Sequence, residues 1–213
     1  MKNLLHNLVK HINSQDQKVI IGISGHGASG KTTFAENLLK LLGDSKVNYI
    51  NTDPYIIGSN IRKYTMIDYQ YRGELHRDKM TACHPAAHHT TALERDIKML
   101  RDGLNFYSID TSYSRSRLMT SKEINIVEGM SVAFTDPSIY NLKIYLYTDG
   151  ETEFLRRSIR DVTERGTEIE YLRQSHEERR IQYELFMHPY HRNFDIIIKN
   201  SNDTFIIEEQ NIY

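Results

Sequence analysis

The sequence predicts an α/β fold, a three-layer α/β/α sandwich in which helices cover both faces of a mostly parallel, five-stranded sheet. Short runs rich in Val, Ile and Leu are typical of strands that are buried on both faces of a parallel sheet. Apolar residues at helical spacing lie between those runs. A glycine-rich loop joins the first run to the first long helix, which is typical of a phosphate site. We expect strands over residues 19–24, 46–51, 123–128, 141–147 and 195–199.

The composition fits one domain over residues 1–213, because a chain of this length can bury one substantial core. The formal net charge of −1 gives no electrostatic footprint for nucleic acid. Cys83 is the one cysteine, so no internal disulfide can form and a reducing, cytoplasmic location is expected. No apolar run reaches the length of a membrane span, and residues 1–16 form an amphipathic pattern, so we expect no membrane contact.

The loop after the first strand has the phosphate-binding pattern Gly-x-x-x-x-Gly-Lys-Thr. Its glycines let successive backbone N–H groups approach phosphate oxygens, and the N-terminus of the next helix adds positive potential. Lys31 can reach the outer phosphates, and the Thr32 hydroxyl can hold Mg²⁺. The sequence therefore predicts a P-loop NTPase-type fold whose nucleoside triphosphate site comprises Gly25, His26, Gly27, Ala28, Ser29, Gly30, Lys31, Thr32 and Thr33.

Two acidic residues follow strands that should end at the same edge of the sheet as this loop. Asp53 lies in a loop, since Pro54 disfavours helix at the residue before it. An aspartate there can take the proton of an attacking hydroxyl, so we interpret Asp53 as a general base; a turn-forming or N-cap aspartate is the alternative. Glu128 ends a later strand and is expected to assist Mg²⁺ together with Thr32, directly or through water.

Residues 55–119 are expected to form an excursion that binds the phosphoryl acceptor. Its first part is rich in Tyr and Arg, which is typical of a pocket or lid, although a solvated loop explains the same composition. His84 and His88 would share a helix face, but nothing adjacent supplies a third metal ligand. Alternation near its end predicts a small antiparallel ribbon with Arg115 and Arg117 on one face, where they contact either ligand or solvent.

Residues 150–167 are expected to form an arginine-rich helical lid. Leu155, Ile159 and Val162 have the spacing of one packed helix face. Guanidinium groups can neutralise the oxygens of a transferring phosphoryl group, so part of the cluster is interpreted as closing over the phosphates. Ordinary ion pairs four residues apart are the alternative. The cluster comprises Arg156, Arg157, Arg160 and Arg165.

With these motifs, the chain resembles the uridine kinase and phosphoribulokinase family of P-loop kinases from residue 19 to about residue 207. The resemblance implies that the γ-phosphoryl group of ATP or GTP is transferred to a hydroxyl of a small metabolite, a nucleoside such as uridine or cytidine or a related sugar alcohol. The matching motifs are the phosphate loop, Asp53-x-Tyr55, His84-Pro85, Glu128-Gly129, and Arg157-x-x-Arg160-Asp161 followed by Glu164-Arg165-Gly166.

The family resemblance and the residue chemistry together assign roles to these positions. Family members often form dimers or tetramers, so a homo-oligomer is implied. Thr32 and Glu128 are expected to serve the metal. We expect catalytic roles for Lys31, Asp53, Arg157, Arg160 and Arg165, and acceptor contacts from Asp53, Tyr55, His84, Arg115 and Arg157.

The departures from the family pattern all concern recognition of the acceptor. Uridine kinases usually place Asp before the His-Pro pair, where it binds ribose hydroxyls, and Cys83 stands there instead. Their base-recognising Tyr and His have no match in residues 109–115, and a second lid arginine is replaced by Thr167. Losing several such groups should change the substrate or its affinity. A nucleotide-dependent regulatory switch and a degenerate kinase without uridine activity are the alternatives.

Overall fold

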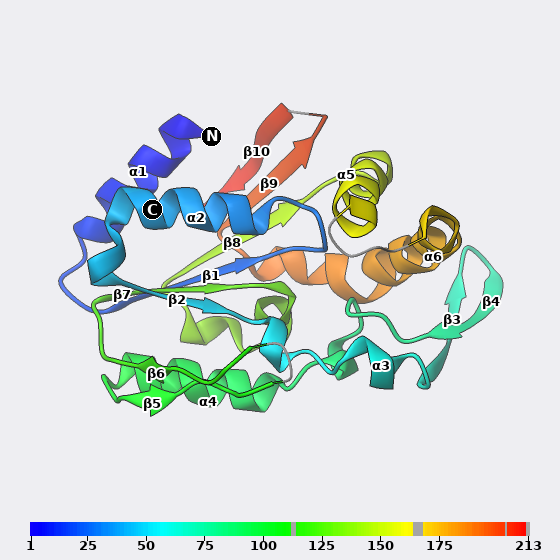
Figure 1. Ribbon diagram of the computed structural model, residues 1–213. Helices are drawn as coiled ribbons and strands as arrows, with labels where there is room; N and C mark the ends of the chain where they lie inside the picture. The colour runs from blue at the N-terminus through cyan, green and yellow to red at the C-terminus, as the bar shows by residue number, and fades with distance from the viewer. Residues whose placement is uncertain (112–113, 164–167, 203, 212–213) are drawn as a thin grey trace.

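The computed structural model describes residues 1–213 except 112–113, 164–167, 203 and 212–213. A central sheet has the strand order β10-β9-β8-β1-β7-β2 (Figure 1). The five strands expected from the sequence are all present and mutually parallel, which confirms the predicted fold class. They are β1 (Val19–Ser24), β2 (Val47–Asn51), β7 (Ile124–Glu128), β8 (Leu142–Tyr147) and β9 (Ile196–Ser201).

The sheet has a sixth strand that was not expected, β10 (Thr204–Gln210). It runs antiparallel to β9 after a turn that includes Asn202, whose φ is 47°. Ile206 is 48% exposed and Ile207 is 39% exposed, so this outer strand is only partly covered. An edge strand of this kind lacks the continuous apolar run of the inner strands, so it could not be predicted from its residues.

Helices cover both faces of the sheet and complete the three layers (Figure 1). Two of them share one hydrophobic cluster with the sheet, and the third packs in the cluster on the opposite face. Leu8, Leu38, Leu93 and Ile97 are fully buried in these clusters. The three helices are α1 (Lys2–Asn13), α2 (Lys31–Leu42) and α4 (Thr90–Arg101).

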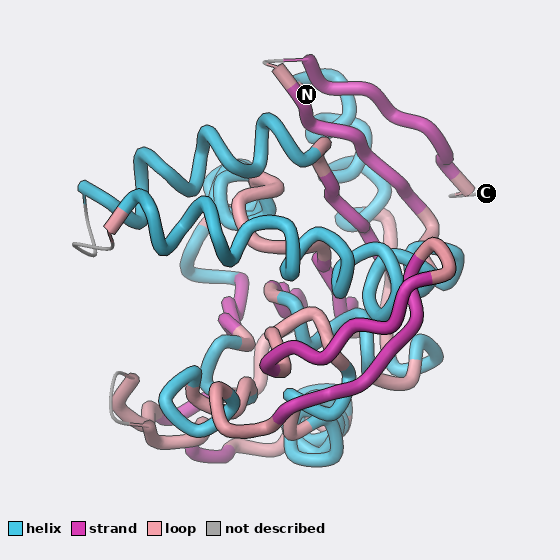
Figure 2. The backbone as a smooth tube through the Cα atoms, turned by 90° about the vertical axis from the view of Figure 1, so that its right-hand side faces the viewer, coloured by secondary structure: helices cyan, strands magenta, loops and turns pink. Residues whose placement is uncertain are grey.

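Two further helices lie at the carboxyl edge of the sheet, α5 (Gly150–Thr163) and α6 (Ile169–Gln182). Figure 2 shows these helices side by side. A π-helical turn, Tyr183–Met187, continues α6. α5 is the helix expected to form the lid.

The expectation that the apolar stripe of α5 is packed was wrong. Leu155 is 59% exposed, Ile159 is 61% exposed and Val162 is 38% exposed. The helix instead buries its polar face, because the side chains on that face find ionic partners at the cleft. The buried residues are Thr152, Glu153, Arg157 and Asp161.

Two small hairpins lie outside the central sheet. The expected ribbon is formed by β5 (Phe106–Tyr107) and β6 (Leu118–Met119), which pair antiparallel. A second hairpin, near α3 (Ser59–Arg62), was not expected; its turn residues Arg72 and Gly73 have φ values of 51° and 87°. Its strands are largely exposed, so they lack a buried apolar face that the sequence could reveal. They are β3 (Met66–Tyr71) and β4 (Glu74–Lys79).

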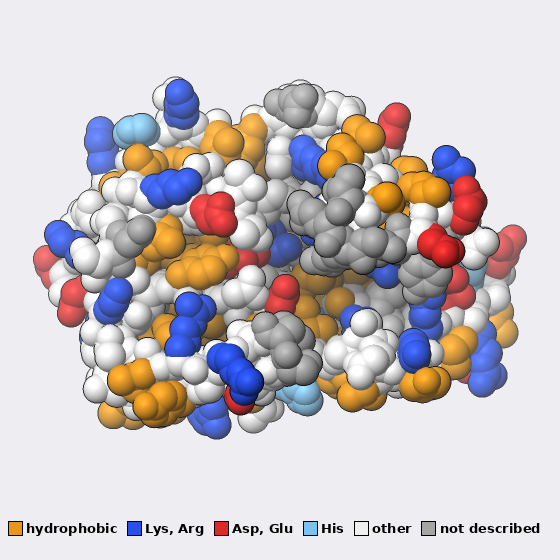
Figure 3. Space-filling view, viewed as in Figure 1, with side chains coloured by type: hydrophobic (Ala, Val, Ile, Leu, Met, Phe, Trp, Pro, Cys, Tyr) orange, Lys and Arg blue, Asp and Glu red, His pale blue; other side chains and the backbone are white. Residues whose placement is uncertain are grey.

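The surface agrees with the near-neutral composition. On the face shown in Figure 3, basic and acidic side chains are interspersed around a hollow at the middle of the molecule. Within the described part of the chain, every helix is too short or too polar to cross a lipid bilayer.

Candidate active site

The phosphate loop lies between β1 and α2, at the carboxyl edge of the sheet. Gly25 and Gly30 have φ values of 140° and 94°, in the region that favours glycine. A Cβ atom at Gly25 would clash with the carbonyl oxygen of Leu146, and one at Gly30 would clash with the side-chain amide of Asn200. The loop is therefore pressed against β8 and β9, and its path requires glycine at both positions.

Lys31 and Thr32 begin α2 and face Glu128 at the end of β7. The Lys31 Nζ donates to the His26 carbonyl at 3.1 Å and lies 4.0 Å from Glu128 Oε1. The Thr32 hydroxyl lies 3.4 Å from both Glu128 carboxylate oxygens. A buried carboxylate, a hydroxyl and an ammonium group therefore lie close together. The carboxylate and hydroxyl oxygens are ligands of the kind that Mg²⁺ prefers, and the ammonium group suits a neighbouring polyphosphate.

Tyr49 on β2 fixes the carboxylate of Glu128 from the other side. Its hydroxyl donates to Glu128 Oε2 at 2.8 Å. Burial and the negative charge of Glu128 raise the pKa of the Tyr49 hydroxyl far above its usual range, so it stays a hydrogen-bond donor. The sequence did not single out this residue, because its role depends on the pairing of β2 with β7.

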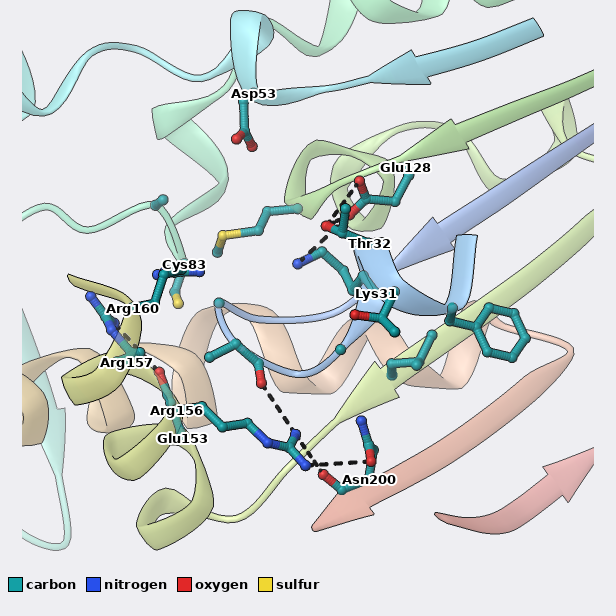
Figure 4. Close-up of a pocket in the computed structure, with 18 of the residues that line it drawn as sticks. Lys31, Thr32, Asp53, Cys83, Glu128, Glu153, Arg156, Arg157, Arg160 and Asn200 are labelled. Carbon is teal, nitrogen blue, oxygen red and sulfur yellow. Dashed lines mark hydrogen bonds and ion pairs between the residues drawn. The ribbon is translucent and has the colours of Figure 1, made fainter. Parts of the chain in front are cut away.

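A cleft of about 810 Å³ opens beyond the phosphate loop and contains most of the predicted site residues. It is lined by Lys31, Thr32 and Glu128 on one side and by Asp53 on another. Figure 4 shows the Asp53 carboxylate pointing into this space, apart from the ionic cluster around Glu128. Asp53 also lines a smaller cavity against the β5–β6 ribbon. Asp53 therefore lines both the main cleft and the ribbon cavity.

Three of the four lid arginines are described, and each lines the cleft. Arg156 donates to the carbonyl oxygens of Ala28 at 3.3 Å and Asn200 at 2.9 Å, which ties the lid helix to the phosphate loop and β9. Arg160 Nε donates to Asp161 at 2.8 Å. Arg165 lies outside the described residues.

Arg157 is held by two carboxylates of its own helix. Its guanidinium lies 3.5 Å from Glu153 and 3.4 Å from Asp161. The first of these is the ion pair that the helical spacing offered as an alternative to a lid role. Arg157 therefore pairs within α5 and also lines the cleft, and its role in a lid stays a prediction.

Behind the loop lies a buried ionic network that the sequence did not predict. His26 Nε2 lies 3.0 Å from the Thr148 N–H and 3.2 Å from the Thr148 carbonyl, and its Nδ1 lies 2.8 Å from the Gly27 carbonyl and 3.4 Å from Glu153. Arg180 donates to Glu153 at 3.1 Å. Burial alone would raise the pKa of Glu153, but the His26 hydrogen bond and the surrounding positive charges lower it to about 2.

The residues expected to contact the acceptor do not all reach a cavity. Tyr55 is 1% exposed, and its hydroxyl donates to Asp96 in the core. Tyr55 is nevertheless one of the residues that line the ribbon cavity. His84 accepts a hydrogen bond from the Ala86 N–H and packs against Phe186, outside the residues that line the cleft.

The neighbours of two predicted positions do line the cavities. Cys83, directly before His84, lines the main cleft. Arg115 is exposed, while Ser114 and Arg117 beside it line the ribbon cavity. Thr167 lies outside the described residues.

The histidines near residue 88 do not form a metal site in the described part of the chain. No group of three or more His, Cys, Asp or Glu side chains is placed there to hold an ion. His88 instead contacts the Ser131 hydroxyl and the Ala82 carbonyl, each at 2.8 Å. Burial lowers the pKa of His88 to about 4, so it is neutral at physiological pH.

Two solved structures with folds similar to this one are kinases. The chain aligns with phosphoribulokinase from Rhodobacter spheroides at a TM-score of 0.56 and 16% identity, covering 87% of this chain and 71% of that one. It aligns with D-glycerate 3-kinase from Cryptococcus neoformans at a TM-score of 0.55 and 10% identity, covering 95% and 97%. At these identities the likeness shows the fold alone.

Sequence comparison is more specific. The chain is 32% identical over 206 residues to the uridine kinase of Shewanella amazonensis, covering 88% of this chain and 89% of that protein. It is 29% identical over 204 residues to the uridine kinase of Clostridium perfringens, covering 89% and 87%. Residues 20–206 match the Phosphoribulokinase / Uridine kinase family. The chain therefore belongs to the phosphoribulokinase/uridine kinase family, a family of small-metabolite kinases.

Proposed function

We propose that this protein transfers the γ-phosphoryl group of ATP to a hydroxyl of a small metabolite, either a nucleoside or a related sugar alcohol. The observation that carries the proposal is that Asp53, Lys31 and the Thr32–Glu128 pair line one cleft. Phosphoryl transfer depends mainly on positioning and electrostatic stabilisation, and these groups supply both. The similarity to two uridine kinases supports the nucleoside, whereas Cys83 at the usual ribose-binding position supports a different alcohol.

The phosphate loop would hold the nucleotide through its backbone N–H groups, with Lys31 beside the outer phosphates. Thr32 and Glu128 would hold Mg²⁺, directly or through water, and Tyr49 would keep the Glu128 carboxylate oriented. Bound Mg²⁺ would supply charge neutralisation at the transferring phosphoryl group. GTP in place of ATP fits the same phosphate contacts.

Asp53 would accept the proton of the acceptor hydroxyl as its oxygen attacks phosphorus. The excursion over residues 55–119 would supply the acceptor cavity next to this carboxylate. Arg157 and Arg160 would close over the phosphates as part of a lid over residues 150–167, in which Arg165 is the third catalytic arginine. Exclusion of water by that lid would favour transfer over hydrolysis.

ADP release measured with ATP, Mg²⁺ and single added acceptors tests the proposal. We expect ADP formation to depend on a small hydroxylated compound, tried first among uridine, cytidine and sugar alcohols. Lys31→Ala should lower that rate by about 10²- to 10³-fold, because it removes a cation from the developing phosphate charge. ADP formation that needs no acceptor, or that only a protein partner stimulates, would instead support the regulatory switch.

A further inference from the structure

One wall of the cleft is lined by arginines and by a short segment that follows β4. The segment is residues 81–83, and it faces the cleft together with α5 and α6. Figure 4 shows Cys83 beside Arg157 and Arg160, on the side of the cleft away from Lys31. Arg179 of α6 lines the same cleft. The sequence motifs did not draw attention to Arg179, because it lies outside the lid segment.

Two of these arginines have donor groups that no atom of the described residues accepts from. The Nε atoms of Arg157 and Arg179 are buried, and neither has a hydrogen-bond partner among the described residues. Arg157 is 9% exposed as a whole residue, so its free donor is enclosed at the cleft wall. A buried donor without a partner is costly, and a ligand that accepts from it removes that cost.

Three described carboxylates line the cleft, those of Asp53, Glu128 and Glu153, and among the described residues no ion pair joins any of them to Arg179. Glu153 already serves His26, Arg157 and Arg180, and Glu128 serves Lys31, Thr32 and Tyr49. In the part of the chain that the structure describes, no carboxylate lies within ion-pair distance of Arg179, whereas Arg173 and Arg180 of the same helix pair with Glu170 and Glu184. Within the described residues, the charge of Arg179 is therefore not neutralised by an ion pair.

Cys83 adds no negative charge to this wall. Burial, helped by the negative charge of Glu153, raises the pKa of its thiol to about 12, so the thiol is neutral at physiological pH. A carboxylate at this position would have offset the arginines and accepted hydrogen bonds from sugar hydroxyls. A neutral, weakly polar thiol does neither.

From this juxtaposition we infer that the phosphoryl acceptor is an anion, a small hydroxylated metabolite whose carboxylate or phosphate group binds Arg179 and the free Nε of Arg157 beside Cys83. The inference rests on the proposed kinase function and narrows it to the acidic members of the sugar-alcohol class. The acceptor hydroxyl would lie at Asp53. Its oxygen would form a bond to the γ-phosphorus as the bond to the bridging oxygen of ADP breaks, and its proton would pass to Asp53.

Matched acceptor pairs test the inference. ADP formation would be measured with D-glycerate against glycerol and with D-ribose 5-phosphate against D-ribose, and uridine would serve as the neutral nucleoside. We expect an anionic member to exceed its neutral partner in kcat/KM by at least about 100-fold, since a neutral ligand leaves the Arg179 charge and the buried Nε of Arg157 without an anionic acceptor. The two pairs distinguish a carboxylate from a phosphate.

Arg179→Gln then isolates the anion contact. We expect KM for the anionic acceptor to rise at least about tenfold while KM for ATP changes less than about twofold, because a charge-assisted bond to the acceptor alone is lost. Arg179→Lys should retain the preference for the anion. Arg173→Gln, on the exposed side of the same helix, is the matched control and should change neither value.

Several outcomes would overturn the inference. Preference for uridine or for the neutral partner would do so, as would an Arg179→Gln variant that raises KM for ATP as much as KM for the acceptor. If turnover is too slow to measure, calorimetric titration of the same compounds into the protein with a bound non-hydrolysable ATP analogue measures binding of the acceptor directly. Failure of both anionic compounds to bind in that experiment would also overturn the inference. Turnover of neutral acceptors alone would leave the kinase proposal intact, whereas failure to bind the ATP analogue would remove that proposal itself.

Discussion

Glu153 is surrounded by basic side chains from three parts of the chain. His26 belongs to the phosphate loop, Arg157 to α5 and Arg180 to α6, and all three lie within 3.5 Å of its carboxylate. Glu153 is 3% exposed, so these contacts are barely screened by solvent. One carboxylate thus joins the loop that would bind phosphates to both helices of the lid region.

Glu153→Gln keeps the shape of this side chain and removes its charge. We expect the free energy of unfolding to fall by about 2–4 kcal/mol, because Arg157 and Arg180 are left near one another without their shared anion. Urea denaturation at pH 7 measures the change. The matched control is Glu170→Gln, whose ion pair with Arg173 is exposed on both sides and should contribute less than about 1 kcal/mol. Equal effects at the two sites would contradict a structural role for the network.

Where the signal is local, the sequence identified residues that the structure places in one cleft, and their roles stay predictions. Lys31 and Thr32 follow from the loop pattern, and Asp53 and Glu128 from their places at strand ends, because parallel strands bring those ends to one edge. Tyr49 and the contacts of Glu153 with His26 and Arg180 were missed, since these partners are distant in the chain and have no fixed spacing. Arg179 was missed because it lies outside the lid segment.

At the level of elements, α5 has an unusual distribution of side chains for a helix beside a sheet. Its charged face is buried at the cleft, and its apolar stripe of Leu155, Ile159 and Val162 faces outward. Helical periodicity identifies two faces but not which of them is covered. The apolar face of a helix is usually the buried one, but in α5 the charged face is buried because its residues form ion pairs.

Substitutions in this stripe test the arrangement. Leu155→Asn and Ile159→Asn should each change the free energy of unfolding by less than about 1 kcal/mol, because the side chains are already exposed to water. Leu38→Ala in α2 is the contrasting variant, since Leu38 is fully buried, and it should cost about 2–5 kcal/mol. Thermal or urea unfolding measures both. A large loss of stability on changing the stripe would mean that α5 packs through it.

The strands illustrate the same limit on prediction. The five parallel strands are mostly buried and could be recognised by their apolar runs. β10 and the β3–β4 hairpin are exposed along much of their length, so pairing with a neighbour stabilises them without an apolar pattern. Phe205 of β10 still reaches the cleft and stacks on Phe34, with ring centroids 6.2 Å apart.

For the whole molecule, a buried neutral histidine couples stability to pH. His88 has a folded-state pKa of about 4, whereas an unfolded histidine titrates near 6.5. The unfolded chain therefore binds the proton more readily than the folded chain does. The free energy of unfolding consequently decreases as the pH falls from about 6.5 towards 4.

Replacing His88 should remove this part of the acid sensitivity. Between pH 7 and pH 5, we expect the wild-type protein to lose about 2 kcal/mol more unfolding free energy than His88→Gln, because the variant has no imidazole to protonate on unfolding. Urea denaturation at the two pH values measures the difference. His6→Gln is the control, since His6 is exposed on α1. Equal pH dependence in the wild type and His88→Gln would contradict the assignment.

The central claim is that the phosphate loop and Asp53 act together on one acceptor hydroxyl. The most direct test compares Asp53→Asn with the wild type, using ATP-analogue titration for binding and acceptor-dependent ADP formation for turnover. We expect the dissociation constant of the analogue to stay within about twofold while kcat falls by about 10²- to 10⁴-fold, because the base is lost and the nucleotide contacts are kept. A kcat near that of the wild type would contradict the account.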